Sequence, residues 1–499
     1  MIDFYLNGKR KRVANVSADT SILELVREQL AQTGTKEGCA SGDCGACTVA
    51  IGEPDAEGTL SYQSANACVT PAYQLNGCHL VTVEGLADDE HLHPAQAAMV
   101  ECHASQCGFC TPGIVMSLFT LYEDQRRRPA PLTQQRLEGA LGGNLCRCTG
   151  YRPIRDAALG MQDYPPATPD WAANAALGTD VAALAKEVAT QENSAGGGAT
   201  GYAMPRDIAA LRKLKADRPG ARLVAGGTDL WLETTQQVKD LVDIIDVSRV
   251  AELTTVEDTT TGWWLGASVT LSQLTPLLAE HYPPFEHLMH RFASSQIRNR
   301  ATLGGNIANA SPIGDTPPVL LALDARLRLD GPSGSREMAL ADFFHDYKKT
   351  ALADDEFIAA VFLPRPAADH NLKVWKLSKR REDDISAVLG AFAWRLEDGL
   401  MRDVHLAFGG MAGIPRRAPA AEAALEGSRP DDASFAHARA ALAKELTPMA
   451  DARGSAEYRT LAAGNLLERL RLMIAVDAQP AANDKNTTAN KVTLDAYAH

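Results

Sequence analysis

The sequence predicts an α+β protein of several domains, and three observations lead to this prediction. At 499 residues the chain is too long for a single hydrophobic core, so three or four domains are expected. Strand-like and helix-like segments occupy separate stretches early in the chain and alternate from residue 204 onward. All ten cysteines lie between Cys39 and Cys148, which sets this part of the chain apart from the rest.

Residues 1–88 are expected to form a small α+β domain. Residues 2–13 alternate apolar and polar side chains around Asn7-Gly8, a two-residue turn that β-hairpins favour. Ser21 and Glu24 have the spacing of a capping box, which indicates that a helix follows. A loop rich in glycine and cysteine comes next. Further short strands are expected at residues 48–51 and 80–83.

Residues 89–164 are expected to form a compact helical bundle. The apolar periodicity indicates four helices joined by short loops. Pro129 and Pro131 end the second helix, and Gly142-Gly143 ends the third. The expected helices are residues 95–105, 113–127, 133–141 and 152–161.

Residues 165–201 have the composition of a linker. Prolines at the start, an alanine-rich middle and a glycine-rich end all oppose packing. Gly196, Gly198 and Gly201 match the dinucleotide-binding pattern G-x-G-x-x-G, but no strand precedes them. A dinucleotide-binding loop would follow a strand, so we do not interpret these glycines as a dinucleotide site. We expect a flexible connection here.

The remainder of the chain is expected to form two more α+β domains and a tail. Beyond residue 373 long strands are followed by helices rich in Ala, Leu and Glu, which places a boundary near residues 366–372. The end of the chain is polar and poor in large apolar residues. The expected segments are an α+β domain at 202–368, a second at 369–478 and a disordered tail at 479–499.

The charge balance argues against several classes of partner. Lys and Arg number 49 against 62 Asp and Glu, which gives a net charge of −13. Nucleic acids and anionic membranes both require a basic face, so neither is expected as a main partner. The chain has no apolar run that could span a bilayer, and its N-terminus lacks the pattern of a signal peptide. A cytoplasmic location is expected, where clustered cysteines bind metals or act in redox chemistry.

The first cysteine quartet has the spacing of an iron–sulfur site. Cys39, Cys44 and Cys47 follow the pattern C-x4-C-x2-C, and Cys68 comes further along the chain. Plant-type ferredoxins hold a [2Fe–2S] cluster with this spacing. The glycines of the loop allow backbone N–H groups to approach the sulfurs. Zinc sites usually consist of two short knuckles, so zinc fits this spacing poorly.

The second quartet is ambiguous when taken alone. Cys107 and Cys110 form a C-x2-C pair, and Cys146 and Cys148 form a C-x-C pair. A redox pair, a zinc site and an iron–sulfur cluster are all compatible with these residues. Each pair precedes an expected helix, whose positive N-terminal end favours thiolates.

Both cysteine-rich segments closely resemble those of the xanthine dehydrogenase/molybdenum hydroxylase family. Residues 38–49 together with 64–71 resemble its ferredoxin domain, and residues 106–115 together with 143–154 resemble its second iron–sulfur domain. The resemblance implies a β-grasp ferredoxin-like domain and a four-helix iron–sulfur bundle, each holding a [2Fe–2S] cluster. The implied ligands are Cys39, Cys44, Cys47 and Cys68 for the first cluster and Cys107, Cys110, Cys146 and Cys148 for the second.

Other residues of the cysteine-rich part take their interpretation from the same resemblance. Gln106 and Cys148 match residues that lie close to the pterin end of the molybdenum cofactor in the family. Cys78 and Cys102 match no ligand position, and Cys102 is expected to be a small core residue on a helix.

Two glycine loops resemble the FAD-binding segments of this family. A loop of successive backbone amides after a strand can cradle a pyrophosphate, although glycine after a strand is more often a simple turn. The resemblance implies an α+β FAD-binding domain followed by an α+β C-terminal flavoprotein domain. Lys376 would tune the reduced flavin as a nearby cation; otherwise it is a solvated lysine on a strand. The implied FAD contacts are Leu223, Val224, Ala225, Gly226, Gly227, Thr228, Asp229, Leu230, Phe292, Thr302, Leu303, Gly304, Gly305, Asn306, Asp315, Ile358 and Lys376.

The resemblance also implies partners and a co-substrate. Tyr347 and Asp383 match residues near the nicotinamide site of NAD-linked members. The resemblance covers residues 1–163 and 200–475 and does not include the family's molybdenum-binding portion. It therefore implies a small subunit that joins a molybdenum-binding large subunit in a heterodimer, paired into a heterotetramer.

The implied function is electron transfer in a xanthine dehydrogenase. A separate molybdenum subunit would hydroxylate xanthine or hypoxanthine, and electrons would pass through the two clusters to FAD and on to NAD. Three alternatives remain open: the same relay for an aldehyde or N-heterocycle hydroxylase, a zinc-binding redox sensor or scaffold, and a stand-alone NADH-oxidising reductase. No hydrolytic catalytic site is expected in the chain.

Overall fold

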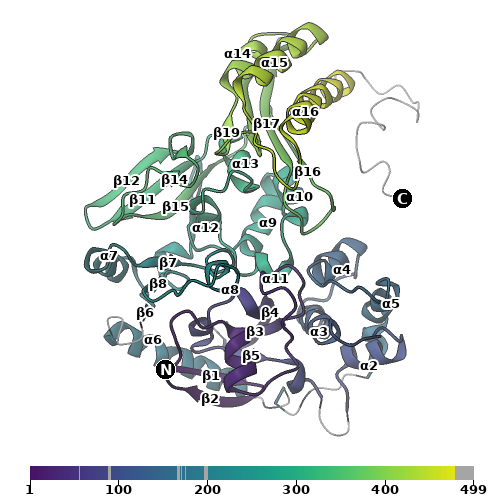
Figure 1. Ribbon diagram of the computed structural model, residues 1–499, viewed down its shortest axis with the longest axis vertical. Helices are drawn as coiled ribbons and strands as arrows, with labels where there is room; N and C mark the ends of the chain where they lie inside the picture. The colour runs from purple at the N-terminus through teal and green to yellow at the C-terminus, as the bar shows by residue number, and fades with distance from the viewer. Residues whose placement is uncertain are drawn as a thin grey trace. The chain divides into compact units, whose positions relative to one another are not determined.

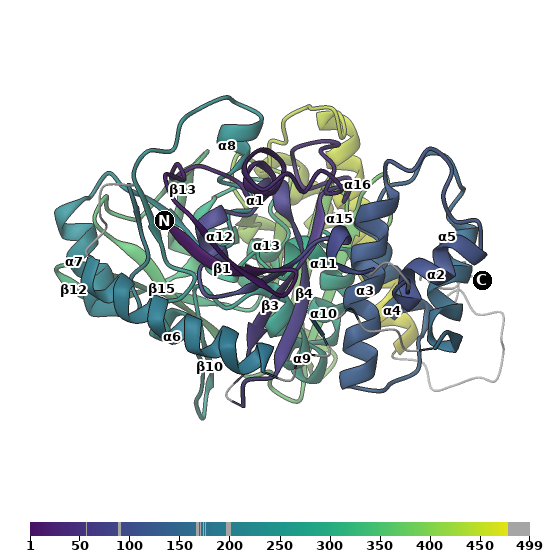
Figure 2. The ribbon, with the colours of Figure 1, turned by 90° about the horizontal axis from the view of Figure 1, so that it is seen from below.

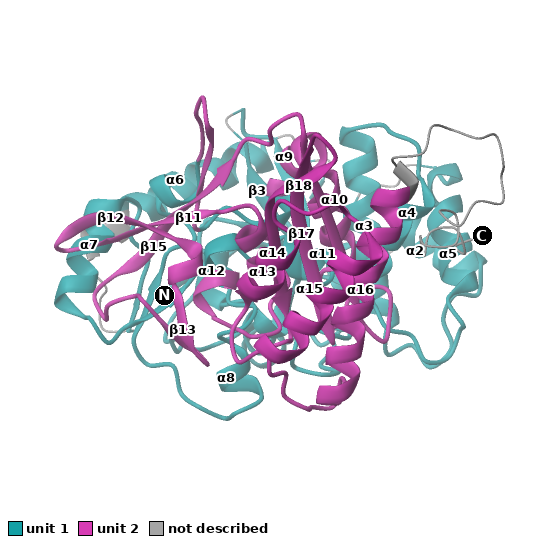
Figure 3. Cartoon of the chain, turned by 90° about the horizontal axis from the view of Figure 1, so that it is seen from above, with its two compact units in different colours: residues 1–255, 268–273, 293–305 teal, residues 256–267, 274–292, 306–499 magenta. Residues whose placement is uncertain are grey.

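The computed structural model describes residues 1–477, apart from 56, 88–90, 166–168, 170, 173, 175 and 196–200. The expected tail at 479–499 and most of the dinucleotide-like glycine pattern lie outside the described residues. The chain divides into two compact units, coloured separately in Figure 3. The first unit contains residues 1–255, 268–273 and 293–305, and the second contains 256–267, 274–292 and 306–499. This division passes through the segment expected as the domain 202–368.

The first unit begins with a five-stranded mixed sheet, drawn in purple in Figure 1. Its order is β2-β1-β5-β3-β4, with β1 antiparallel to β2 and parallel to β5. Asn7 and Gly8 have φ of 48° and 79°, as the two-residue hairpin turn requires. The strands are β1 (Ile2–Leu6), β2 (Lys9–Val13), β3 (Thr48–Pro54), β4 (Leu60–Asn66) and β5 (His79–Val81).

The expected capping box is present, but the helix that follows is not a regular α-helix. The Ser21 hydroxyl accepts a hydrogen bond from the Glu24 amide at 3.1 Å, and the Glu24 carboxylate accepts one from the Ser21 amide at 2.7 Å. Helix α1 (Ile22–Glu24) continues directly into a π-helical turn, Leu25–Gln29. The wider turn still buries Leu25 and Val26 in the core beneath the sheet.

Four helices form the second part of the first unit, as the apolar periodicity predicts. They pack around a shared core that includes Ile114, Leu118 and Phe119 from the long central helix. That helix also packs against strands β3 and β4 of the sheet. The helices are α2 (Pro94–Glu101), α3 (Thr111–Arg127), α4 (Gln134–Leu141) and α5 (Arg152–Gly160).

The expectation that residues 165–201 form an unpacked linker is wrong for the described part of this segment. Helix α6 (Leu177–Ala195) lies along strands β1 and β3 (Figure 2) and buries Leu177, Val181, Leu184 and Val188 on one face. These residues recur at helical spacing, which an alanine-rich composition obscures when only the average is considered. Composition alone therefore missed an amphipathic helix.

The first unit ends with a small parallel sheet and short helices. The sheet order is β6-β8-β7, and both pairings are parallel. Helix α7 (Ile208–Asp217) connects β6 to β7, in the usual manner of a parallel crossover. The remaining elements are β6 (Tyr202–Ala203), β7 (Arg222–Val224), α8 (Leu232–Thr235), β8 (Ile244–Asp246) and α11 (Ser295–Arg298), with α12 (Leu303–Ala308) continuing into the second unit.

The second unit contains two antiparallel sheets. The first has the order β12-β11-β15-β10-β9, and a β13–β14 hairpin accompanies it. Its elements are β9 (Val256–Asp258), β10 (Gly262–Gly266), β11 (Arg326–Gly331), β12 (Gly334–Ala339), β13 (Phe344–Asp346), β14 (Lys349–Thr350) and β15 (Phe357–Pro364), with helices α9 (Leu271–His281), α10 (Pro283–Arg291) and α13 (Thr316–Ala322).

The second sheet of this unit packs against three C-terminal helices. Its order is β16-β17-β18-β19, and apolar side chains such as Phe392 and Phe408 form the core with Phe435. Its elements are β16 (His370–Leu377), β17 (Val388–Glu397), β18 (Leu400–Gly409), β19 (Arg416–Arg417), α14 (Pro419–Leu425), α15 (Asp432–Glu445) and α16 (Ala456–Asp477).

These elements confirm the predicted α+β multidomain class. The ferredoxin-like sheet, the bundle of four helices and the two later α+β regions all occur in the predicted order. Among the described residues no helix combines the length and apolar character needed to cross a bilayer.

Candidate iron–sulfur and flavin sites

The first cysteine quartet is brought together by a loop and a short helical turn. Cys39 and Cys44 lie in the loop before β3, and Cys47 directly precedes that strand. Cys68 lies in the 3-10 turn Ala67–Val69 after β4. The sulfurs of Cys47 and Cys68 are 3.4 Å apart and buried, and Cys39 contacts both Cys44 and Cys68. All four thiols are therefore close neighbours.

Backbone geometry of this loop suits a sulfur-bound cluster. The amides of Ser41 and Cys44 each donate a hydrogen bond to the Cys39 sulfur at 3.4 Å. Gly42 and Gly45 have φ of 82° and 67°, a left-handed backbone conformation that glycine adopts without strain. Gly38 serves a different purpose, because a Cβ there would lie 2.7 Å from the Cys44 sulfur. The thiols of Cys44 and then Cys68 lower the pKa of Cys39, so the group favours a thiolate.

The second quartet forms two side-chain pairs at the surface of the helical bundle. Cys107 contacts Cys148, and Cys110 contacts Cys146. Cys110 is the N-cap of α3, and the Cys146–Cys148 segment precedes α5. Cys107 and Cys148 are exposed, whereas Cys146 is buried. Burial first and contact with Cys146 second raise the pKa of Cys110 to about 12.

The contacts between the cysteines show how the second quartet is arranged. Among the residues that the structure describes, no group of three or more His, Cys, Asp and Glu side chains is placed to hold one metal ion. A [2Fe–2S] cluster instead takes four cysteines in two pairs, one pair for each iron. The Cys107–Cys148 and Cys110–Cys146 contacts have this paired arrangement. The donor sets therefore fit two-iron clusters, and all ten cysteines are free thiols.

The two remaining cysteines belong to neither quartet, as predicted. Cys78 is fully buried, and burial raises the pKa of its thiol to about 11. The Arg249 guanidinium donates to its sulfur at 3.1 Å. Cys102 is the C-cap of α2 and packs against the bundle core.

The first glycine loop of the predicted flavin site packs against the segment that follows Cys68. A Cβ on Gly226 would lie 1.9 Å from the Arg300 carbonyl oxygen, so only glycine allows this approach. Gly227 has φ of 78°, and a Cβ there would lie 3.0 Å from the Val69 oxygen and 2.7 Å from Pro71. Val69 is the residue after the ligand Cys68. The loop that follows β7 therefore touches the chain that carries a cluster ligand.

The second glycine loop is held at the start of α12. The Thr302 hydroxyl accepts a hydrogen bond from the Gly305 amide at 3.1 Å, and the Leu303 amide donates to the Val269 oxygen at 3.3 Å. A Cβ on Gly305 would lie 2.9 Å from the Thr302 hydroxyl. A side chain at Gly305 would therefore require the Thr302 hydroxyl to move, whereas at Gly226 it would meet backbone.

In the second unit the predicted flavin residues Asp315 and Lys376 form a buried ion pair. The Lys376 ammonium lies 2.5 Å from the Asp315 carboxylate, and both side chains are less than a tenth exposed. The Ser386 hydroxyl also donates to Asp315 at 2.5 Å, and the Thr316 hydroxyl donates to Asn306 at 2.6 Å. Lys376 is therefore not the solvated strand lysine that the sequence left open.

Comparison with known proteins assigns successive parts of the chain to known domain families. Four family models match successive parts of the chain: a 2Fe-2S iron-sulfur cluster binding domain at 4–73 and a [2Fe-2S] binding domain at 82–159, then a FAD binding domain in molybdopterin dehydrogenase at 197–366 and a CO dehydrogenase flavoprotein C-terminal domain at 373–474. The chain belongs to the molybdenum hydroxylase family. Its cofactor-binding domains are thus two [2Fe–2S] domains and one FAD domain.

Curated relatives within the family include several xanthine dehydrogenases. Xanthine dehydrogenase 1 of Arabidopsis thaliana is 32% identical over 82% of this chain and 35% of its own length. Xanthine dehydrogenase/oxidase of Mus musculus is also 32% identical, over 82% of this chain and 34% of its own length. The chain therefore spans about a third of the length of these relatives.

Solved structures with similar folds cover somewhat more than half of the chain. Carbon monoxide dehydrogenase from Hydrogenophaga pseudoflava is similar with a TM-score of 0.52 and 28% identity, covering 54% of this chain and 94% of the matched chain. Quinoline 2-oxidoreductase from Pseudomonas putida 86 gives a TM-score of 0.51 and 25% identity, over 56% and 97%.

The remaining residues predicted for the flavin and nicotinamide sites lie on several elements of the second unit. Ile358 is buried in β15, and Phe292 is the C-cap of α10. Tyr347 is 54% exposed beside the β13–β14 hairpin. Asp383 has φ of 48°, and its carbonyl oxygen accepts a hydrogen bond from the Arg380 guanidinium at 2.7 Å.

The second unit also contains a basic cavity that the sequence did not reveal. It has a volume of about 500 Å³ and is lined by residues of α10, β16, the loop after β16 and α16. The described residues that line it include no Asp or Glu. Its basic lining residues are His287, Arg291, Lys373, Lys376, Lys379, Arg380, Arg381 and Arg469.

Three glutamines contribute contacts that sequence reasoning missed. Gln236 donates to the carbonyl oxygens of Cys39 and Ala40, at 3.1 Å each, and so holds the cluster loop from outside. Gln74 donates to the Ala225 oxygen at 2.5 Å, and Gln296 lies fully buried between the two cysteine-rich segments. No motif marks these residues, since glutamine is common on protein surfaces.

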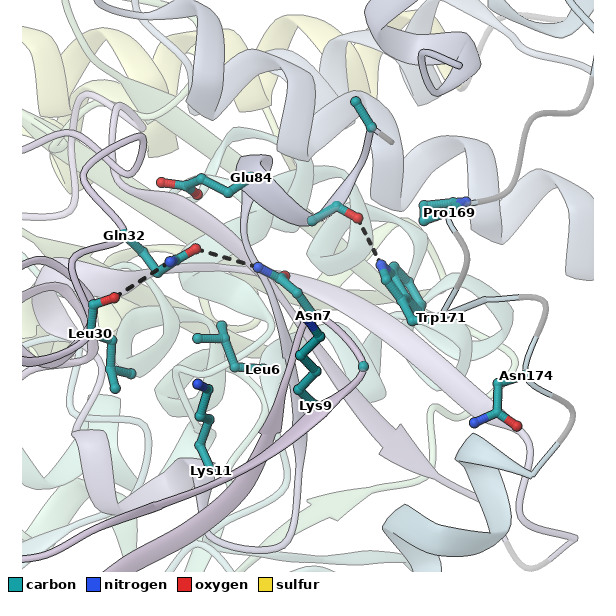
Figure 4. A pocket seen from close by; sticks show the side chains of 13 residues that line it. Leu6, Asn7, Lys9, Lys11, Leu30, Gln32, Glu84, Pro169, Trp171 and Asn174 are labelled. Carbon is teal, nitrogen blue, oxygen red and sulfur yellow. Dashed lines mark hydrogen bonds between the residues drawn. The ribbon is translucent and has the colours of Figure 1, made fainter. Parts of the chain in front are cut away.

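A surface pocket beside the ferredoxin-like sheet also involves the segment expected as linker. Figure 4 shows Trp171 next to Asn7, with the indole N–H donating to the Gly85 oxygen at 2.7 Å. The ring makes edge contacts with His79 and Tyr62. The pocket has a volume of about 640 Å³. Trp171 anchors the start of the segment that leads to α6.

Proposed function

We propose that this chain is the electron-transfer subunit of a cytoplasmic xanthine dehydrogenase. One observation carries the proposal: the first unit holds both cysteine quartets and a flavin-type glycine loop within one compact body. When bound, the clusters carry single electrons and FAD carries two, so that electrons from a xanthine- or hypoxanthine-hydroxylating molybdenum subunit reach NAD as hydride. The residues of this chain bind these groups and set their order.

The order of the groups follows from which residues adjoin each other. Cys44 and Leu145 join the two cysteine-rich segments, because the Leu145 amide donates to the Cys44 oxygen at 3.0 Å. Gly227 joins the flavin loop to the residue after Cys68. Exposed Cys107 and Cys148 leave the second quartet open to the outside. The proposed direction is therefore from the second quartet to the first, and then to the flavin loop.

The partner in this proposal is a molybdenum-binding large subunit. Exposure of Cys107 and Cys148, together with Phe109 at 49% exposed and Tyr151 at 42%, supports contact at this surface. The proposed assembly is a heterodimer paired into a heterotetramer, with Gln106 and Cys148 nearest the pterin. Xanthine is proposed as the substrate because curated relatives 32% identical to this chain are xanthine dehydrogenases.

We further propose FAD and NAD sites on the flavin side. The two glycine loops and the residues Phe292, Asp315, Ile358 and Lys376 are proposed to hold FAD, and Tyr347 and Asp383 to adjoin the nicotinamide. The basic cavity supports a dinucleotide as ligand, since a pyrophosphate requires cationic partners and the chain as a whole is acidic. The Lys376 ammonium is held in place by Asp315.

Anaerobic reduction of the native complex tests the proposal. Visible spectra are recorded after addition of xanthine and, separately, of NADH. Bleaching of flavin and iron–sulfur absorption by both reductants is the expected result. Bleaching by NADH alone would remove xanthine as the substrate and favour an aldehyde or N-heterocycle. Zinc in place of iron and acid-labile sulfide would end the electron-transfer proposal.

The NAD site has its own test. Lys373→Glu places a negative charge in the basic cavity and is expected to raise the KM for NADH about tenfold, which corresponds to ~1.4 kcal/mol of binding. FAD content should be unchanged. Lys444→Glu, on the exposed side of α15, is the matched control and should leave KM unchanged. Equal KM values for both variants would contradict a dinucleotide site at this cavity.

A further inference from the structure

Four buried polar side chains join the two cysteine-rich segments to a helix from the flavin half. We call them the Gln296 network; its members are Thr48, Ser117, Asn144 and Gln296. All are less than a tenth exposed, and Gln296 is fully buried. Polar side chains are rarely buried in such a group unless they satisfy one another's hydrogen bonds.

The hydrogen bonds of the Gln296 network connect every member. The Gln296 amide N–H₂ lies 3.0 Å from the Asn144 oxygen, 3.2 Å from the Ser117 hydroxyl and 3.3 Å from the Thr48 hydroxyl. Ser117 donates to the Asn144 oxygen at 2.6 Å. Asn144 in turn donates to the Gly45 carbonyl oxygen at 3.0 Å.

Each member lies close in sequence to a cluster ligand or to the flavin loop. Thr48 directly follows Cys47, and Asn144 comes two residues before Cys146. Ser117 lies on α3, the helix whose N-cap is Cys110. Gln296 lies on α11, just ahead of the glycine loop that begins at Thr302. The network thus spans both quartets and the segment leading to the flavin loop.

Three glycines allow this close approach. A Cβ on Gly45 would lie 2.2 Å from the Gly143 oxygen, and one on Gly113 would lie 2.1 Å from the Gly45 oxygen. A Cβ on Gly143 would lie 2.4 Å from the Gln296 side-chain oxygen. Backbone therefore packs on backbone between the quartets, and the Leu145 amide donates directly to the oxygen of the ligand Cys44. Such contacts leave little freedom in the separation of the two ligand loops.

We propose that Gln296 is a positioning residue that fixes the distance between the two iron–sulfur clusters. The inference rests on the proposed function, because it concerns the passage of one electron from one cluster, which is oxidised, to the other, which is reduced. No bond or proton is exchanged in that step. Electron passage falls steeply with distance, so a side chain that fixes the separation of Cys44 and Cys146 sets how fast the relay can run.

Spin–spin coupling between the reduced clusters measures this separation directly. In the native complex reduced with dithionite, low-temperature EPR is expected to show splitting of the cluster signals. Gln296→Leu, which keeps the volume but removes the hydrogen bonds, is expected to lose or broaden the splitting at full iron content. Gln29→Leu, at an exposed position of the same unit, is the matched control and should keep it.

A milder variant keeps the proposal testable if Gln296→Leu loses a cluster. Ser117→Ala removes the hydrogen bond to Asn144 and the one accepted from Gln296, but leaves the Gln296–Asn144 bond, and should weaken the splitting while both clusters remain. Hydrogen exchange at the Leu145 amide should also speed up in either variant, because this amide reports the contact between the quartets. Unchanged splitting and unchanged exchange in both variants would overturn the inference. Absence of two iron–sulfur signals in the unmodified complex would instead refute the proposed function.

Discussion

His79 illustrates how burial controls a single titratable residue. Its Nε2 accepts a hydrogen bond from the Gly8 amide at 3.0 Å, and its Nδ1 lies 2.9 Å from the Tyr62 hydroxyl. Burial lowers the pKa of His79 to about 3. Because Nε2 is an acceptor, the ring is neutral in the fold, and a proton there would break the bond to Gly8.

The stability of the protein is therefore expected to fall as the pH drops below the unfolded pKa of histidine. The unfolded chain binds a proton near pH 6.5 that the folded His79 does not bind until about pH 3. Between pH 7.5 and 5.5 this residue should cost about 1.4 kcal/mol of unfolding free energy. Urea unfolding at both pH values measures it. In His79→Gln the pH difference should shrink by that amount, and an identical difference in both proteins would contradict the assignment.

The Asp315–Lys376 pair gives a second prediction at the residue scale. Lys376→Met leaves a buried carboxylate without its cation, and it is expected to lower the unfolding free energy by about 3–5 kcal/mol. Adding Asp315→Asn should restore part of this loss, since the unpaired charge is then removed. Chemical denaturation of the single and double variants provides the measurement. A double variant as unstable as the sum of both single variants would show that the two residues act independently.

At the scale of elements, α6 shows how a helix can be hidden by its composition. Its Leu184 is 2% exposed, and Ala185 packs against Gly77, where a Cβ would lie 2.9 Å from the Ala185 Cα. The Arg10 guanidinium also bonds to the Glu187 carboxylate at 3.0 Å. The helix is thus part of the ferredoxin-like domain and contributes to its core.

Leu184→Ala is accordingly expected to destabilise the protein by about 2–5 kcal/mol, because it opens a cavity beneath α6. Lys186→Ala, on the exposed face of the same helix, should change stability by less than about 0.5 kcal/mol. Thermal or urea unfolding compares the two. If both substitutions were equally harmless, the segment would behave as the flexible linker that its composition indicates.

At the scale of the whole molecule, the two quartets are expected to load independently. Cys107→Ser removes one ligand of the second quartet, and iron and acid-labile sulfide should fall to about half. Cys47 and Cys68 of the ferredoxin-like quartet belong to a different hydrophobic core, so this quartet should keep its visible and EPR signals. Cys102→Ser is the matched control in the same bundle and should leave the iron content unchanged. Loss of all iron in Cys107→Ser would show that the quartets depend on each other.

Much of this architecture could be predicted from local signals. The Asn7-Gly8 turn, the Ser21–Glu24 capping box and the four helices of the bundle depend on short-range spacing, and all are present. The eight ligand cysteines were predicted from spacing and resemblance, and the structure places the members of each quartet together. Buried packing on α6 was missed, because average composition does not report which face of a helix is apolar.

The sequence by itself determined which residues can carry the chemistry: eight cysteines in two quartets and glycines where backbone must approach closely. Only the tertiary structure decided how these parts are connected. Gln296 lies 152 residues from its partner Asn144, and Gly227 meets Val69 across a similar separation. Lys376 and Asp315, which form an ion pair, are also far apart in the sequence. Such contacts depend on the packing of distant segments, and no periodicity or spacing records them.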